Sequence, residues 1–445
     1  MGQVRVCVQP ENPFASNISN QTIAIIPSFT LESGVTLFNA SLSYKTWGKL
    51  SPNKDNVMVV CHAFTGSADV SDWWGPLLGG SGRAFDITKF FVICMNSLGS
   101  PYGSASPVTH RDGDSKKGIY GPEFPLTTIR DDVNFHKMLL DELGVKRIAA
   151  VVGGSMGGML VLEWAYFGKD YIRCIVPIAT SSYHSAWGIS WGEAQRQSIY
   201  ADPKYNDGYY TFQDPPITGL GAARMSALLT YRSRESFELR FSRKTPDKSK
   251  KMTISHEKFP SPPENIHLAI HNDGHHSNRH LVENKSAQID MGNVLNKSSA
   301  LTYFSAQTYL RYKGTQFVNR FDANCYISIS RKLDTHDLSR CRASSISEAL
   351  ALIEQPTLVL GIESDGLFHF SEQEDLASAI PNSRLEKIDS LEGHDAFLLQ
   401  YEQVNTHVLS FLQEVIPDIL ESKSNSEIND IETSFREVDD DIISW

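Results

Sequence analysis

The chain has 445 residues, of which 41% are hydrophobic and 21% charged, so it can bury a large domain core together with an insertion. Its formal net charge of −11 argues against a nucleic-acid-binding protein, because such proteins usually carry a basic face. The six cysteines are scattered without C-x-x-C spacing, which is typical of buried free thiols and argues against a disulfide framework or a zinc site.

The N-terminal residues lack the charged-then-apolar pattern of a signal peptide, and no apolar run approaches the roughly 18 residues that span a membrane. We therefore expect a cytoplasmic protein that has neither a nucleic acid nor a membrane as partner.

Short runs along the chain predict the strands and helices in order. Alternating runs at 23–26, 34–37 and 42–44 predict a β-meander. Nearly continuous apolar runs, which are typical of parallel strands buried on both faces, follow at 57–61, 90–95, 148–152, 174–178, 357–362 and 385–388. Helical patterns lie between them at 133–143, 160–167 and 372–380. This alternation predicts an α/β fold with a mostly parallel sheet.

The alternation stops between residues 181 and 349, where polar and aromatic residues are more frequent. We interpret this interval as a mainly helical lid domain inserted into a core formed by residues 20–180 and 350–420. Within the lid, residues 242–300 have few apolar side chains and predict a disordered loop, and the five histidines between 267 and 280 are interpreted as solvated rather than as a metal site. The acidic tail at 421–445 is expected to be loosely ordered.

The most informative motif is G-x-S-x-G around Ser155, which lies between an apolar strand pattern and an apolar helix pattern. This context is that of a nucleophile elbow, in which a strained turn exposes the serine hydroxyl above the sheet. The backbone N–H of Met156, directly after the serine, is one expected donor of an oxyanion hole. The other is expected from the loop after strand 57–61, at Phe64, with a neighbour in that loop as the alternative.

A serine nucleophile needs a base and an orienting acid, and both are expected after later strands. Asp365 follows strand 357–362 and is the predicted acid, with Glu363 two residues away as the alternative. His394 follows the last strand and is the predicted base. His62, beside another strand end, is interpreted as a structural or loop-positioning residue.

Six motifs together make the chain similar to the homoserine O-acetyltransferases of the α/β-hydrolase superfamily, and most of all to the fungal branch. They are HAFTGS (62–67), DWWGPL (72–77), NSLGSPYGS (96–104), GPEFP (121–125), GGSMGGM (153–159) and EGHDAFL (392–398). The likeness extends over residues 23–411 except the loop at 242–300. Phe64 departs from the leucine common in the family, which leaves a backbone role intact.

The resemblance implies transfer of acetyl from acetyl-CoA, a co-substrate rather than a bound cofactor, to L-homoserine in methionine synthesis. It assigns Ser155, Asp365 and His394 as the triad. It further assigns Arg224 to the substrate carboxylate, Asp395 to the substrate ammonium group and Tyr231 to the pocket wall. It also implies a homodimer formed through lid helices. From the spacing of the cysteines and histidines we expect no metal.

Two alternatives use the same triad. L-serine differs from L-homoserine by one methylene, which a pocket discriminates by only about 1–3 kcal/mol. An esterase or thioesterase would use water as the acceptor, and we expect the lid to exclude water.

Overall fold

The computed structural model describes residues 5–245, 271 and 304–422. The predicted disordered loop at 242–300, except its first four residues and His271, lies outside the described residues, and so does almost all of the acidic tail. These two expectations, like the domain boundaries, stay predictions. Among the described helices, none is both long and apolar enough to cross a bilayer.

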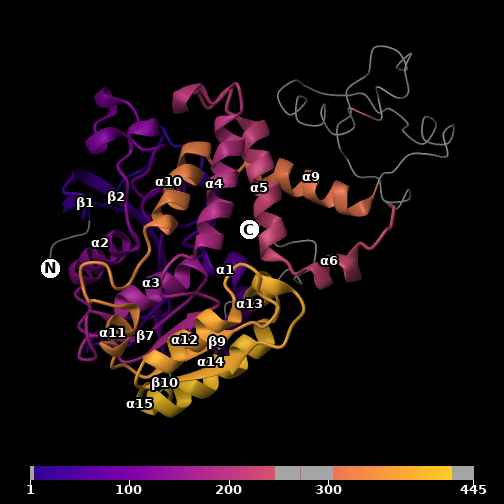
Figure 1. The fold of residues 1–445 in the computed structure, drawn as a ribbon. Helices are drawn as coiled ribbons and strands as arrows, with labels where there is room; N and C mark the ends of the chain where they lie inside the picture. Colours follow the sequence, from indigo (N-terminus) through magenta and orange to yellow (C-terminus); the bar gives the residue numbers. More distant parts are fainter. Residues whose placement is uncertain (1–4, 246–270, 272–303, 423–445) are drawn as a thin grey trace.

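The core is an eight-stranded sheet with the order β1–β2–β6–β3–β7–β8–β9–β10 (Figure 1). The antiparallel pairs are β1–β2 and β2–β6, and the other neighbours are parallel. All six continuous apolar runs become strands, which confirms the predicted α/β fold. The eight strands are β1 (Thr22–Thr30), β2 (Thr36–Trp47), β3 (Val57–Cys61), β6 (Phe91–Met95), β7 (Ile148–Gly154), β8 (Ile175–Ile178), β9 (Thr357–Gly361) and β10 (Ser383–Lys387), and the short strands β4 (Leu78–Gly79) and β5 (Phe85–Asp86) pair separately.

The predicted meander of three strands was wrong, because the runs at 34–37 and 42–44 belong mostly to the single strand β2. The pairing with β1 is interrupted where Pro27 lies opposite Asn39 and resumes in the same register. Proline has no N–H to donate, and Asn39 adopts a φ of 45°. The sequence pattern therefore breaks within β2 while the strand continues.

Helices cover both faces of the sheet, and successive strand residues point to opposite faces. In β3, Val57 and Val59 pack with helices α2, α3 and α12, whereas Met58 and Val60 pack with α14. A capping box at Thr128 and Asp131 starts α2 four residues before the predicted helical pattern. These helices are α1 (Val70–Trp73), α2 (Ile129–Glu142), α3 (Met156–Ala165), α11 (Ile346–Ala351), α12 (Phe370–Ala379), α13 (Ala396–Leu399), α14 (Tyr401–Val415) and α15 (Pro417–Leu420).

Between β8 and α11, the described residues 186–240 and 305–334 form a group of helices that lies over one edge of the sheet (Figure 1). A fully buried ion pair joins this group to the core, because Lys332 Nζ of α10 lies 2.5 Å from Asp132 Oδ2 of α2. The same Nζ donates a hydrogen bond to the Leu98 carbonyl at 2.7 Å. The helices of this group are α4 (Ala186–Tyr200), α5 (Ile217–Tyr231), α6 (Arg234–Arg240), α9 (Ser305–Val318) and α10 (Ala323–Asp334).

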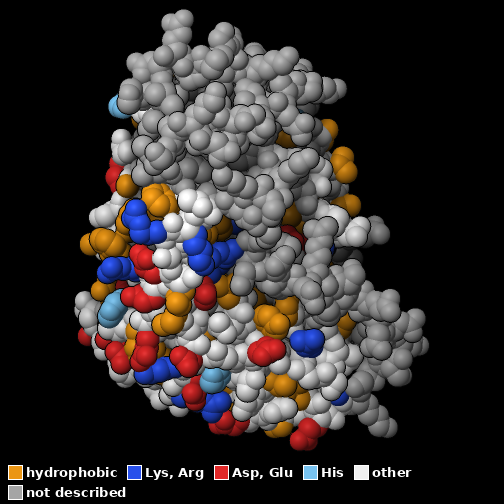
Figure 2. Space-filling view, turned by 90° about the vertical axis from the view of Figure 1, so that its right-hand side faces the viewer, with side chains coloured by type: hydrophobic (Ala, Val, Ile, Leu, Met, Phe, Trp, Pro, Cys, Tyr) orange, Lys and Arg blue, Asp and Glu red, His pale blue; other side chains and the backbone are white. Residues whose placement is uncertain are grey.

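Acidic and basic side chains lie interspersed on the described part of the face shown in Figure 2. Exposed pairs of opposite charge, such as Arg384 with Glu414 at 2.6 Å, each contribute little to stability. The fold is held mainly by the apolar layers on either side of the sheet.

Candidate active site

Ser155 lies in the turn between β7 and α3 with a φ of 59° and a ψ of −126°, a conformation that non-glycine residues rarely adopt. Two hydrogen bonds hold its backbone in place. The Ser155 N–H donates to the Ile178 carbonyl at 3.0 Å, and Thr180 Oγ1 donates to the Ser155 carbonyl at 2.8 Å. The side chain is largely buried and lines a pocket above the sheet. This is the geometry expected of a nucleophile elbow.

The glycines around Ser155 are required by close approach of other parts of the core. A Cβ on Gly157 would lie 2.2 Å from the Cys61 carbonyl oxygen, and one on Gly154 would lie 2.5 Å from the Phe397 ring. Neither contact leaves room for a methyl group. The elbow is therefore tight because β3 and α13 press against it from two sides.

His394 and Asp365 form a buried pair beside the serine. His394 Nδ1 lies 2.6 Å from Asp365 Oδ2. The other carboxylate oxygen, Oδ1, accepts the backbone N–H groups of Leu367 at 2.8 Å and Phe368 at 2.9 Å. Because both oxygens are engaged, the carboxylate orientation is fixed relative to the imidazole.

The bond to Asp365 determines which nitrogen of His394 is available to the pocket. Nδ1 carries the hydrogen that it donates, so Nε2 is left as an acceptor. Nε2 is buried and has no hydrogen-bond partner among the described residues. Burial disfavours the charged ring, but the charge and hydrogen bond of Asp365 outweigh burial, so the pKa of His394 is raised.

The alternative acid, Glu363, lies elsewhere. Its side chain is exposed and pairs with Lys387 at the surface, whereas the Asp365 side chain is fully buried against His394. The structure thus brings the preferred residue of the two, Asp365, next to the imidazole.

The loop after β3 forms another wall of the pocket. The turn is closed by a hydrogen bond from the Gly66 N–H to the Ala63 carbonyl at 2.9 Å. Phe64 lines the pocket and packs its ring against Tyr326 of α10, with ring centroids 4.7 Å apart. Met156 is the first residue of α3, so its N–H has no acceptor within the helix. Met156 therefore directly follows Ser155 at the start of α3, and Phe64 lines the same pocket as Ser155.

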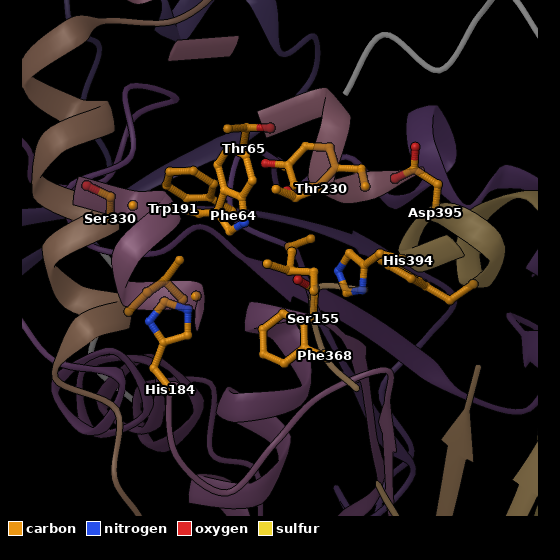
Figure 3. A pocket seen from close by; sticks show the side chains of 18 of the residues that line it. Phe64, Thr65, Ser155, His184, Trp191, Thr230, Ser330, Phe368, His394 and Asp395 are labelled. Carbon is orange, nitrogen blue, oxygen red and sulfur yellow. The ribbon is translucent and has the colours of Figure 1, made fainter. Parts of the chain in front are cut away.

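The pocket has an empty volume of about 900 Å³, which includes space open to solvent. Figure 3 shows Ser155 and His394 facing this space, with His184 and Ser330 across from them. Its wall from the inserted helices includes Trp191, Gln195 and Ser330, none of which was predicted. No local motif marks these residues, because they reach the site only through the packing of α4 and α10.

Asp395 and Tyr231, which were assigned to the substrate site by resemblance, both line the pocket. Asp395 Oδ2 lies 3.0 Å from Arg232 Nε, a partner that sequence reasoning missed although it directly follows Tyr231. Burial is the largest influence and raises the pKa of Asp395, against the opposing charges of Arg232, His394 and Arg224. The pocket therefore contains an acidic group, Asp395, beside the His394 imidazole.

Arg224 is not among the residues that line the pocket, but it packs against Tyr231, which is. Its guanidinium carbon is 5.5 Å from the Tyr231 ring centroid and 4.8 Å from that of Phe317. The side chain is almost fully buried, and Nη1 has no hydrogen-bond partner among the described residues. An unpaired buried N–H on a cationic group is costly, so Nη1 is suited to an anionic acceptor.

Comparison with known proteins agrees with this geometry. A family model described as alpha/beta hydrolase fold matches residues 56–401. The chain therefore belongs to the α/β-hydrolase fold family.

Its similarity to curated proteins defines the family more narrowly. The chain is 63% identical to a protein of Emericella nidulans named homoserine O-acetyltransferase, over 94% of this chain and 91% of that one. A protein of the same name from Schizosaccharomyces pombe is 53% identical over 98% and 96%. The chain thus belongs to the homoserine O-acetyltransferase family. A crystal structure of a homoserine O-acetyltransferase from Bacillus anthracis has the same fold, with a TM-score of 0.70, 20% identity and coverage of 88% and 97%.

Proposed function

We propose that the protein transfers the acetyl group of acetyl-CoA to the hydroxyl of L-homoserine through an acetyl-enzyme on Ser155, in methionine biosynthesis. The observation that carries this proposal is the buried Asp365–His394 pair beside Ser155, in a pocket that also contains Asp395. The names of the fungal relatives support homoserine as the acceptor.

In the first half-reaction, His394 Nε2 accepts the proton of Ser155 Oγ while Oγ forms a bond to the thioester carbonyl carbon. Asp365 stabilises the imidazolium that results. The N–H groups of Met156 and Phe64 donate to the oxyanion of the tetrahedral intermediate. When the carbon–sulfur bond breaks, His394 returns the proton to the thiolate, so that coenzyme A leaves as the thiol.

In the second half-reaction, homoserine binds as a zwitterion between two opposite charges. Arg224 receives the carboxylate, which supplies the missing acceptor for its buried Nη1, and Asp395 receives the ammonium group. His394 takes the proton of the homoserine hydroxyl as its oxygen attacks the acetyl-enzyme. Breakdown of this second intermediate releases O-acetyl-L-homoserine, and Ser155 recovers its proton from His394.

Water must be excluded for transfer to exceed hydrolysis. The aromatic and aliphatic side chains of Trp191, Leu333 and Phe368 line the pocket and offer water little to bind. We propose that the inserted helices hold the acetyl-enzyme in this apolar space until the acceptor arrives.

The test is a steady-state assay of thiol release from acetyl-CoA with L-homoserine, with L-serine and without acceptor. Release that depends on homoserine, at a much higher kcat/KM than with serine, is the expected result. Preference for serine would agree with the proposed mechanism but would refute L-homoserine as the acceptor. Equal release without acceptor would refute transferase activity in favour of hydrolysis, and turnover by a folded Ser155→Ala variant would refute the nucleophile.

A further inference from the structure

His62 is a fully buried residue between β3 and the loop that contains Phe64, and it does not line the pocket. Two hydrogen bonds determine its tautomer. The Ser97 N–H donates to His62 Nε2 at 3.0 Å, so Nε2 is an acceptor and Nδ1 carries the hydrogen. His62 Nδ1 lies 2.8 Å from the Ala63 carbonyl oxygen and therefore donates to it.

The Ala63 carbonyl belongs to the same peptide group as the Phe64 N–H. A trans peptide is planar, so its C=O and N–H point in opposite directions. The Ala63 oxygen is held by two donors, His62 Nδ1 and the Gly66 N–H at 2.9 Å. Holding the oxygen on the buried side orients the Phe64 N–H away from the His62 ring.

We infer that His62 is a positioning residue for the oxyanion hole, and that it aims the Phe64 N–H at the reacting carbonyl oxygen by fixing the Ala63–Phe64 peptide. This inference rests on the proposed role of Phe64 in acyl transfer at Ser155. It assigns a mechanistic purpose to a histidine that touches neither substrate nor serine.

The Ser97 N–H determines the His62 tautomer, and the next residue, Leu98, is held by two hydrogen bonds. The Leu98 N–H donates to Asp132 Oδ1 at 2.9 Å, and Lys332 Nζ donates to the Leu98 carbonyl at 2.7 Å. The Ser97 N–H, one residue earlier, is thus kept in place. Burial is the largest influence on the ring and lowers the pKa of His62 to about 4, so the neutral tautomer persists at neutral pH.

The test compares His62→Leu, which removes the donor, with His62→Asn, whose amide can replace Nδ1. We expect His62→Leu to lower kcat for acetyl-enzyme formation by about 10- to 100-fold. This is no more than the decrease in kcat expected when one oxyanion-hole donor is removed completely. The KM for acetyl-CoA is expected to change little, and His62→Asn is expected to recover most of kcat. The affinity for a trifluoromethyl ketone, which forms an anionic adduct with Ser155, is expected to fall by the same factor as kcat.

The matched control is His136→Leu. His136 is also buried, and its Nε2 lies 3.3 Å from the Asn96 carbonyl oxygen, next to Ser97, but among the described residues its side chain has no hydrogen bond to the loop around Phe64. We expect this variant to lose thermal stability while kcat stays near that of the wild type. A loss of kcat comparable to that of His62→Leu would overturn the inference. It would show that any disturbance of the backbone around Asn96 and Ser97 is enough to lower kcat.

The inference is also overturned if folded His62→Leu keeps kcat within about threefold, or loses kcat without losing ketone affinity. If His62→Leu does not fold, His62→Gln gives the same test, since its amide reaches towards Ser97 and not towards the Ala63 oxygen. Hydrolysis of an activated acetyl ester distinguishes failure of the proposed acceptor, homoserine, from failure of the proposed role of His62. An enzyme that ignores homoserine but hydrolyses the ester refutes the proposed acceptor, and the His62 variants still test the oxyanion hole.

Discussion

Asp365→Asn is the substitution that most directly tests the proposed base. Asparagine can keep its oxygen on the backbone N–H groups of Leu367 and Phe368, which both bind Oδ1. Its NH₂ group then faces His394 Nδ1, where the carboxylate accepted a hydrogen bond. Two donors cannot bond to each other, so the imidazole is expected to move its hydrogen to Nε2. In that tautomer it cannot accept the serine proton.

The size of the effect follows from the distance. At 2.6 Å and an effective dielectric constant of about 20, the attraction between an imidazolium and the carboxylate is about 6 kcal/mol. The transition state contains that imidazolium, and each 1.36 kcal/mol corresponds to roughly a factor of ten in rate. We therefore expect kcat to fall by roughly 10⁴-fold, with a nearly unchanged KM for acetyl-CoA.

The measurement is the rate of coenzyme A release in single turnover, with the unfolding midpoint of each variant as a check on folding. Glu363→Gln is the control, because Glu363 is the neighbouring carboxylate that pairs with Lys387 at the surface. It is expected to keep kcat within about twofold, as surface pairs contribute little. A folded Asp365→Asn variant that keeps a tenth or more of kcat would show that Asp365 does not orient the base.

Three further predictions concern pH, packing and the acceptor. Because the pKa of His394 is raised and the base must be neutral, kcat/KM is expected to fall as pH drops through a value above about 6.5, and an acid limb well below that pH would contradict the assignment. Gly157→Ala places a Cβ 2.2 Å from the Cys61 carbonyl oxygen, and we expect it to lower the free energy of unfolding by roughly 3 kcal/mol in a denaturant titration. Gly80 has open space around its Cβ position, so Gly80→Ala is expected to change the free energy of unfolding little. Arg224→Ala is expected to raise the KM for homoserine by roughly 100-fold while the pre-steady-state burst of thiol persists, and equal loss in both half-reactions would assign Arg224 another role.

Most of the sheet could be predicted because buried parallel strands need continuous apolar runs, as in β3 and β7. The inserted helices were harder to predict. Residues 323–334 form α10 although they contain β-branched and polar residues, and Lys332 within them is fully buried. A buried lysine fits only because Asp132 lies beside it, and that partner is 200 residues earlier in the chain.

The residues of the candidate site also fall into two groups, those that sequence motifs reveal and those that they miss. The positions of Ser155 and His394 follow from short motifs, since the backbone turn that exposes each residue is encoded locally by glycines. Arg232 carries no such motif, and its contact with Asp395 depends on how α5 meets the loop after β10. Sequence patterns reveal residues whose role needs a special local backbone, and they miss residues whose role arises from packing between distant elements.

Because of the insertion between β8 and β9, Ser155 is synthesised well before Asp365 and His394. Asp365 lies 210 residues after Ser155. At a synthesis rate of about 5–20 residues per second, a nascent chain spends roughly 10–40 s with Ser155 made and with Asp365 and His394 still missing. During that interval β8 has β7 on one side and no β9 on the other, so it is a temporary edge strand. A nascent chain that ends before β9 therefore lacks Asp365 and His394, and it leaves one edge of β8 open to pairing with another strand.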